Sequence, residues 1–282
     1  MPDPALTEVP LQFGEGGRLF GILTIPSSPP RNSQALPVFL FLSAGLLHRV
    51  GPARLHVLLA RELARTGFSS LRVDLAGTGD TPPRPGLTYQ QSVAADWEEI
   101  VGVLDARLGY LPLVLVGLCS GADNAIRLTP KEPRVVGMVL LDPICFLDDG
   151  FRARAVFMKY TNPARYLAWL KHHYKALARP VAESREAIDP LTLRDLPTRE
   201  QLRAAFESVR KRQGRVLSVF TQYALQYYNR AGQLGRVLNV EGYRQFCTEC
   251  FWPEAEHTYS LELHRRRLMD EIKTWATAYM RS

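Results

Sequence analysis

The chain has 282 residues and a formal net charge of +7, with 46% hydrophobic and 22% charged residues. This composition is typical of a globular protein and excludes a disordered or fibrous one, and the length suits one large α/β domain, with or without an insertion. No apolar run approaches the roughly 20 residues of a membrane span, and the N-terminal residues do not resemble a signal peptide. We therefore expect a cytoplasmic protein without a transmembrane segment.

Short apolar runs alternate with segments of helical period over residues 1–145, which predicts a largely parallel sheet covered by helices. A Gly-rich turn near the start indicates an antiparallel hairpin. The expected strands are residues 11–13, 18–26, 37–42, 68–74, 113–117, 134–142, 215–220 and 243–251. The expected helices are residues 51–67, 89–108, 122–128, 163–177, 198–212 and 260–280.

The alternation is interrupted in the middle of the chain, so we predict an α/β core of residues 1–147 and 214–282 with a helical cap inserted at residues 148–213. The cap is basic, because 15 Lys and Arg stand against 6 Asp and Glu between Phe151 and Arg215. This charge belongs either to solvated helical faces or to a surface that attracts an anionic substrate or an acidic partner, such as an acyl carrier protein. No nucleic-acid-binding motif accompanies it, so nucleic acid is not an expected partner.

Residues 117–121, Gly-Leu-Cys-Ser-Gly, have the spacing of the G-x-S-x-G turn that presents a nucleophile between a strand and a helix. The turn is strained and brings the strand and the helix close together, so it requires small residues two positions before and after the nucleophile. Gly117 and Gly121 occupy those positions around Cys119, whereas leucine and alanine occupy them around Ser120. The pattern therefore favours Cys119 as the nucleophile. The alternative without chemistry is a cysteine buried in a glycine-rich turn.

The base is expected late in the chain, because enzymes with this elbow carry their histidine in a loop between the last strand and the last helix. His257 stands in that loop. His56 and His264 fall within expected helices, and His172 and His173 fall within the expected cap. Position and elimination therefore select His257.

The acid that orients the histidine usually follows the strand before last, but residues 215–229 contain neither Asp nor Glu. Asp142, at the carboxyl end of the strand after the elbow, is the candidate in its place. The alternative for Asp142 is a turn residue before Pro143. A cysteine enzyme can also operate as a Cys–His dyad, because the acid mainly fixes the tautomer and orientation of the imidazole.

A thiol at this position is suited to nucleophilic attack, because an imidazolium and a helix N-terminus both lower its pKa. Attack on a carbonyl creates an oxyanion that two backbone amides would hold. Ser120 supplies the first amide in this interpretation. Leu46, in the loop after the strand at residues 37–42, is our choice for the second, and Gly45 is the alternative.

The motifs together resemble the α/β hydrolase superfamily across nearly the whole chain. Residues 72–80, Arg-Val-Asp-Leu-Ala-Gly-Thr-Gly-Asp, resemble its R-x-D-x-x-G-x-G-D turn, which buttresses the site. More narrowly, HRVGPARLHVLLARELARTG at residues 48–67, the GLCSGA stretch and the cap resemble the bacterial exosortase-associated (PEP-CTERM) hydrolases. The cysteine elbow is also similar to that of dienelactone hydrolases, whose late aspartate is missing here. The resemblance implies the α/β-hydrolase fold with a cap.

The function that these residues favour is hydrolysis of an ester, lactone or thioester through an acyl-cysteine intermediate on Cys119. The substrate would be a small molecule or a carrier-bound acyl group. An acyltransferase with the same intermediate and a non-catalytic binding protein are the alternatives. Cys247 and Cys250 form a lone C-x-x-C without a second pair of ligands, so packing is favoured over a zinc or redox site, and no metal or cofactor is expected.

Overall fold

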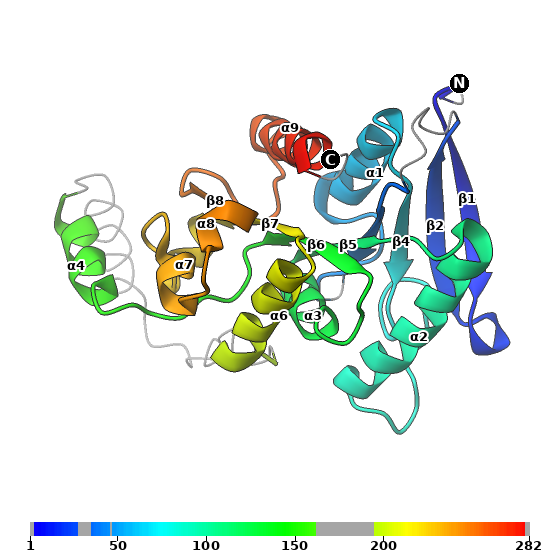
Figure 1. Ribbon diagram of the computed structural model, residues 1–282, viewed down its shortest axis with the longest axis horizontal. Helices are drawn as coiled ribbons and strands as arrows, with labels where there is room; N and C mark the ends of the chain where they lie inside the picture. Colours follow the sequence, from blue (N-terminus) through cyan, green and yellow to red (C-terminus); the bar gives the residue numbers. More distant parts are fainter. Residues whose placement is uncertain (1–2, 28–34, 46, 162–194, 280–282) are drawn as a thin grey trace, which may run out of the picture.

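The computed structural model describes residues 3–27, 35–45, 47–161 and 195–279. Within these ranges the chain forms one sheet of eight strands in the order β1-β2-β4-β3-β5-β6-β7-β8, which Figure 1 shows together with the helices that cover it. β1 and β2 are antiparallel, as are β2 and β4, and the other neighbouring strands are parallel. The predicted α/β class with a mostly parallel sheet is therefore confirmed.

The strands are β1 (Leu6–Phe13), β2 (Leu19–Pro26), β3 (Val38–Leu42), β4 (Ser70–Asp74), β5 (Leu113–Leu118), β6 (Val135–Leu141), β7 (Arg215–Thr221) and β8 (Cys247–Trp252). The α-helices are α1 (Leu55–Arg65), α2 (Tyr89–Leu108), α3 (Ser120–Leu128), α4 (Phe151–Thr161), α6 (Arg199–Lys211), α7 (Gln233–Leu238), α8 (Tyr243–Phe246) and α9 (Glu262–Tyr279).

Most expected elements agree with these bounds to within a few residues. The exceptions are β1, which begins at Leu6 and not at Leu11, the helices α4 and α7, for which no range was expected, and one difference of type. The strand expected over residues 243–251 begins only at Cys247, because Tyr243–Phe246 form the short helix α8. The helical turn brings the rings of Tyr243 and Phe246 into edge-to-face contact at 6.0 Å and lets Tyr243 stack on Phe206 of α6. The helix expected over residues 163–177 lies outside the described residues.

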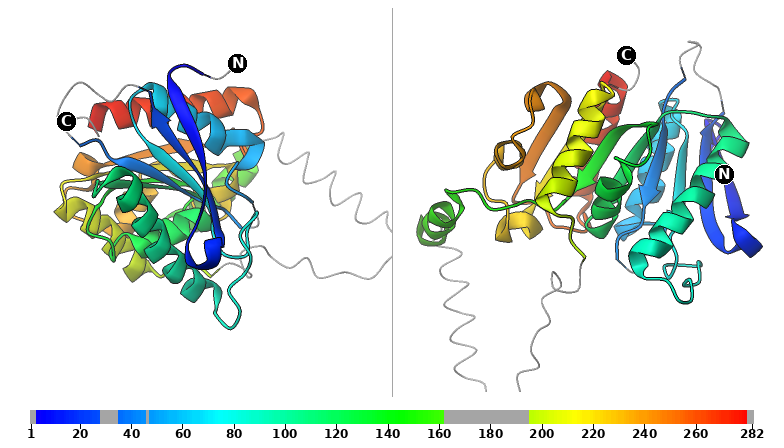
Figure 2. Two further views of the ribbon diagram at one scale, coloured as in Figure 1. Left: turned by 90° about the vertical axis from the view of Figure 1, so that its right-hand side faces the viewer. Right: turned by 60° about the horizontal axis from the view of Figure 1, so that its bottom comes forward.

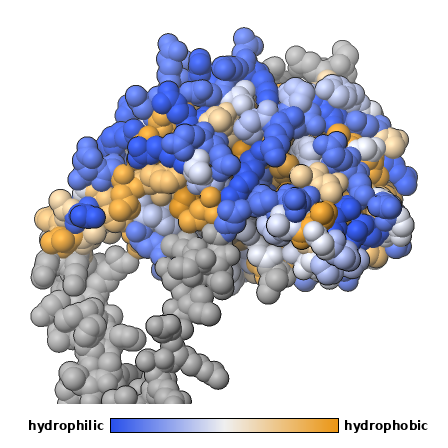
Figure 3. All heavy atoms as spheres, turned by 90° about the horizontal axis from the view of Figure 1, so that it is seen from below, coloured by the Kyte–Doolittle hydropathy of each residue, from blue (hydrophilic) through white to orange (hydrophobic). Residues whose placement is uncertain are grey.

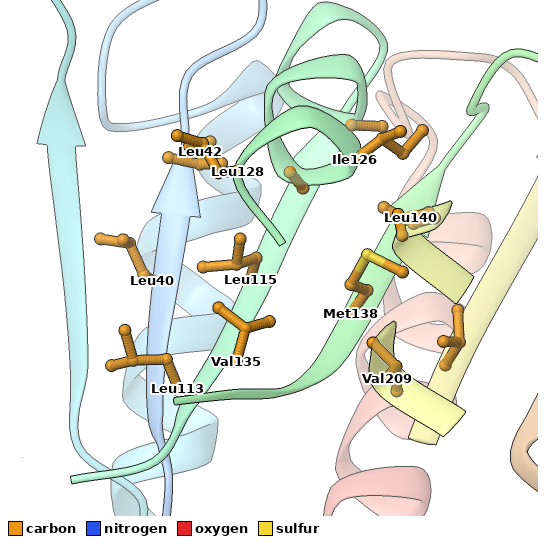
Figure 4. Packing of buried hydrophobic residues seen from close by; sticks show 14 of the residues in the cluster. Leu40, Leu42, Leu113, Leu115, Ile126, Leu128, Val135, Met138, Leu140 and Val209 are labelled. Carbon is orange, nitrogen blue, oxygen red and sulfur yellow. The ribbon is translucent and has the colours of Figure 1, made fainter. Parts of the chain in front are cut away.

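Successive side chains of the central strands point to opposite faces of the sheet, as the period of two in a strand requires. Leu40 and Leu42 of β3 pack with α2, α3 and α6, in the cluster that Figure 4 shows. Phe39 and Phe41 of the same strand pack on the other face with α1 and α9. The two views of Figure 2 show the sheet between these helix layers. Burial on both faces explains why the strands were recognisable as continuous apolar runs.

The helix α6 belongs to the segment that the sequence assigns to the cap, yet it packs against the sheet. Leu202, Phe206 and Val209 on its buried face join the cluster formed by β6, β7 and α3. α4 differs, because Val156 and Phe157 are exposed, and Figure 3 shows hydrophobic side chains gathered where α4 lies. The division into core and cap stays a prediction, since half of the cap, residues 162–194, lies outside the described residues.

Among the helices that the structure describes, none combines the length and the apolar character needed to cross a membrane.

Candidate active site

The elbow lies in the centre of the sheet, where β5 ends at Leu118 and α3 begins at Ser120. Cys119 is the single residue between them and has φ 55° and ψ −119°, a conformation that residues other than glycine rarely adopt. Its N–H donates to the Leu141 carbonyl at 2.9 Å, and its own carbonyl accepts from the amide of Ala122 at 2.9 Å. The hydrogen bonds at both ends of the residue hold the strained backbone in place.

The two glycines of the elbow permit the close passage of strand and helix. A Cβ atom at Gly117 would lie 2.2 Å from the carbonyl carbon of Gly121, and a Cβ atom at Gly121 would lie 2.5 Å from the Leu42 carbonyl oxygen. Both separations are far shorter than van der Waals contact. Side chains at these positions would therefore force β5, α3 and β3 apart, which is the physical reason for the G-x-C-x-G spacing.

His257 and Asp142 meet although 115 residues separate them in the sequence. His257 lies in the loop between β8 and α9, and its Nδ1 is 2.7 Å from Oδ2 of Asp142, the first residue after β6. The Asp142 side chain is fully buried. The structure thus brings together Asp142 and His257, the residues that the sequence suggests as acid and base.

Thr221 at the end of β7 holds the Asp142 carboxylate in place. Its backbone N–H donates to Oδ1 at 2.6 Å and its hydroxyl donates to Oδ2 at 2.7 Å. The backbone of Asp142 has φ 48°, and its N–H donates to the Val219 carbonyl at 2.8 Å. Because β7 holds both the carboxylate and the backbone of Asp142, this residue presents a rigid acceptor to His257.

The imidazole of His257 also contacts Cys119 and Tyr223. Burial disfavours its charged form, but hydrogen bonds to Asp142 and to the Cys119 side chain, together with their negative charges, raise the pKa of His257 to about 9. The Tyr223 ring stacks on the imidazole with 4.0 Å between ring centroids. The arrangement can therefore hold an imidazolium between a carboxylate and a sulfur.

Sequence reasoning did not identify Thr221 and Tyr223. The only available signal was position: both follow the strand at residues 215–220, where the usual acid is missing. A hydroxyl residue at that strand end can reach a carboxylate on the adjacent strand, since neighbouring strands lie about 4.8 Å apart.

The expected oxyanion donors lie in two segments. Ser120 is the first residue of α3, and the loop after β3 carries Gly45 and Leu46. Leu46 lies outside the described residues, so its amide stays a prediction. The Gly45 amide, which was the alternative, donates to the Ser120 hydroxyl with 2.6 Å between Gly45 N and Ser120 Oγ.

The turn after β4 supports this loop through a buried carboxylate. Asp74 accepts a hydrogen bond from the Arg49 amide at 2.5 Å and from the Asp80 amide at 3.1 Å, and it pairs with the Arg49 guanidinium. A Cβ atom at Gly79 would lie 2.2 Å from the Asp74 carboxylate, so only glycine fits there. These contacts join residues 72–80 to the loop that follows β3.

The other three cysteines have properties unlike those of a nucleophile. Cys145, Cys247 and Cys250 are free thiols, and burial raises the pKa of each one, that of Cys250 to about 12. Cys247 and Cys250 of the C-x-x-C pair project to opposite faces of β8, where they pack in different clusters. Among the residues that the structure describes, no group of three or more His, Cys, Asp or Glu could hold a metal ion.

A scan against protein families finds a match over residues 39–248 to the model described as the Alpha/beta hydrolase family, which is more than half of the chain. The chain belongs to the alpha/beta hydrolase family. The matched range contains the elbow and Asp142, whereas His257 lies beyond its end. A search of curated proteins finds no match to this chain.

Solved structures share the fold of this alpha/beta hydrolase family member at low sequence identity. An esterase from Pyrococcus furiosus has a TM-score of 0.58 at 12% identity, and the alignment covers 98% of this chain and 91% of that one. A cold-adapted esterase from an Arctic intertidal metagenomic library has a TM-score of 0.54 at 14% identity, covering 97% and 96%. A proline iminopeptidase from Mycobacterium smegmatis has a TM-score of 0.55 at 15% identity, covering 96% and 98%. The narrower resemblance to exosortase-associated and dienelactone hydrolases stays a prediction.

Proposed function

We propose that this protein hydrolyses an ester, lactone or thioester through an acyl-enzyme intermediate on Cys119. The observation that carries the proposal is the hydrogen-bonded series of Cys119, His257 and Asp142, which joins the elbow to a buried carboxylate through an imidazole. A nucleophile bonded to a base that a third group orients is the arrangement expected of covalent catalysis. The esterases among the structural neighbours are compatible with this chemistry.

The reaction begins with the Cys119 proton on His257, because the raised pKa of His257 favours an imidazolium beside a thiolate. The thiolate attacks the carbonyl carbon, a C–S bond forms, and the carbonyl π electrons move to oxygen. When the carbonyl reforms, the bond to the leaving group breaks and the imidazolium protonates that group. His257 then takes a proton from water while the water oxygen forms a bond to the acyl carbon. When the carbonyl reforms, the C–S bond breaks, the acid departs and the Cys119 thiolate is restored beside the imidazolium.

The Asp142 carboxylate has two roles in this sequence. It accepts from Nδ1 of His257, which leaves Nε2 to exchange the proton with the sulfur and the leaving group. Its charge also stabilises the imidazolium that persists while the oxyanion exists. Because Thr221 holds both carboxylate oxygens, the imidazole ring has a fixed orientation before the substrate arrives.

Transfer of the acyl group to an acceptor other than water is the second candidate, since the same acyl-cysteine would serve both reactions. The exclusion of water from a capped site would decide between them. Delivery of the acyl group by an acidic carrier protein stays a prediction that rests on the basic segment between Phe151 and Arg215, about half of which lies outside the described residues.

The test is intact-mass spectrometry of the protein after incubation with p-nitrophenyl acetate and a panel of acyl thioesters. We expect one acyl adduct on the wild-type protein, its loss in Cys119→Ala, and slower formation in His257→Ala. Cys250→Ala is the matched control, because it removes a thiol on β8 with a raised pKa and should keep the adduct.

An adduct that survives in Cys119→Ala would assign the nucleophile elsewhere. If no compound in the panel acylated the protein or was turned over, the non-catalytic binding alternative would replace the proposal. Adding candidate alcohol, amine or thiol acceptors to the acylated protein separates transfer from hydrolysis, because transfer yields a product that carries the acyl group.

A further inference from the structure

The Ser120 hydroxyl bridges the two segments from which oxyanion donors are expected. It belongs to the first residue of α3, directly after Cys119, and its oxygen accepts the Gly45 N–H from the loop after β3 at 2.6 Å. The two residues are 75 positions apart in the sequence. In the usual arrangement, backbone amides of these two segments point into the oxyanion site without a side chain between them.

This contact changes what each group can offer to a substrate. A backbone amide has a single proton, so the Gly45 N–H that is directed at Ser120 is not directed at a substrate oxygen. A serine hydroxyl has one proton to donate in addition to its acceptor lone pairs. Because the Gly45 amide occupies the acceptor side of Ser120 Oγ, the hydroxyl proton remains to be donated to another group.

We propose that the Ser120 hydroxyl is itself a donor to the oxyanion, in the place of the Gly45 amide. This inference rests on the proposed acyl-enzyme function. When the Cys119 thiolate adds to the carbonyl carbon and the π electrons move to oxygen, Ser120 donates a hydrogen bond to that oxygen and keeps its proton. The carbonyl reforms as the leaving group departs with the proton from His257, so Ser120 is unchanged at the end.

Two physical features favour a hydroxyl in this position. The Gly45 amide polarises the hydroxyl that accepts from it, and hydrogen bonds in such a series strengthen one another. Ser120 is also held at both ends, by the first turn of α3 through its backbone and by the β3 loop through its side chain. A donor fixed before the reaction needs little reorganisation when charge develops on the oxygen.

The experiment compares two reactions of Cys119, of which one forms an oxyanion and the other does not. Acylation by p-nitrophenyl acetate passes through an oxyanion, and its rate is measured from the p-nitrophenolate that is released. Alkylation by iodoacetamide displaces iodide from carbon and creates no oxyanion at a carbonyl. The ratio of the two rates therefore reports oxyanion stabilisation separately from the reactivity of the thiolate.

We expect Ser120→Ala to slow acylation by about 10²–10³-fold, the usual effect of removing one oxyanion donor, while the alkylation rate stays close to that of the wild-type protein. An unchanged alkylation rate also shows that the variant is folded around Cys119 and His257. Ser43→Ala is the matched control: the Ser43 hydroxyl donates to the Val73 carbonyl at 2.8 Å near the same loop, so its loss should leave the ratio unchanged.

Three results would overturn the inference alone. Acylation that is unchanged or faster in Ser120→Ala would mean that the released Gly45 amide is the better donor. A parallel loss of both rates would mean that Ser120 acts through the thiolate. An equal fall of the ratio in Ser43→Ala would assign the effect to the loop. By contrast, failure of the wild-type protein to acquire an adduct on Cys119 would refute the proposed function and this inference with it.

Discussion

Replacing Asp142 by Asn should lower the pKa of His257 by more than one unit. The rise from 6.5 to about 9 corresponds to about 3 kcal/mol, at about 1.4 kcal/mol per unit. Burial opposes this rise, and the hydrogen bond to Asp142 is the largest contribution in its favour, followed by the contact with Cys119. Asparagine removes the charge from Asp142 and places an amide where the imidazole N–H now finds an oxygen.

The assay is NMR titration of histidine Cε1 resonances, with His257 assigned by comparison with His257→Gln. We expect a midpoint near 9 in the wild-type protein and a lower one in Asp142→Asn. Asp148→Asn is the matched control, because it makes the same change of charge at a carboxylate that pairs with Arg154 and not with His257. A midpoint that does not move in Asp142→Asn, or moves equally in Asp148→Asn, would refute the reasoning.

The remaining predictions concern stability and thiol reactivity. The folded-state pKa of His257 lies above its ordinary value, so its contribution to the free energy of unfolding is complete below pH 6.5 and is lost as pH rises through about 9. Urea titrations should show this loss of stability in the wild-type protein and a smaller loss in Asp142→Asn. Equal losses in the two proteins would contradict the prediction. Gly121→Ala should destabilise the fold by about 2–4 kcal/mol, because its Cβ would meet backbone atoms. The Cβ of Gly102→Ala in α2 would meet nothing within 4 Å, so that variant should be stabilising. Similar melting temperatures for both variants would argue against the close passage of strand and helix at the elbow. Iodoacetamide near neutral pH should modify Cys119 before Cys145, Cys247 and Cys250, whose pKa values burial raises; peptide mapping measures the order, and early modification of a buried thiol would count against it.

Local patterns were sufficient to predict most of the elements, because the central strands are buried on both faces and the helices carry clear periodicity. The helix expected over residues 89–108 corresponds to α2, which begins at a capping box on Thr88. The short helix α8 was not predicted, since its position depends on the contact of Tyr243 with Phe206, a residue far away in the sequence. Tertiary packing overrides local propensity in such short segments.

The sequence predicts the candidate site through the glycine spacing and through the order in which the residues follow one another. The spacing favours Cys119 as the nucleophile, and the position of His257 between the last strand and the last helix favours it as the base. Asp142 followed from the absence of an acid in residues 215–229. Apart from the position of Thr221 at a strand end, no pattern in the sequence indicates that Thr221 fixes the carboxylate or that Gly45 donates to Ser120, because the two contacts depend on the register of neighbouring strands and on the path of a loop.

The register of β5 and β6 pairs Leu118 with Leu141, so Cys119 and Asp142 are each the next residue after a paired position. Both have a positive φ, and both are anchored by backbone hydrogen bonds to an adjacent strand. The backbones of Cys119 and Asp142 are thereby fixed by hydrogen bonds to the sheet. His257, by contrast, lies in the loop between β8 and α9. Because the carboxylate comes from the end of β6, the segment after β7 contacts the imidazole through an aromatic ring, that of Tyr223, and not through an acid.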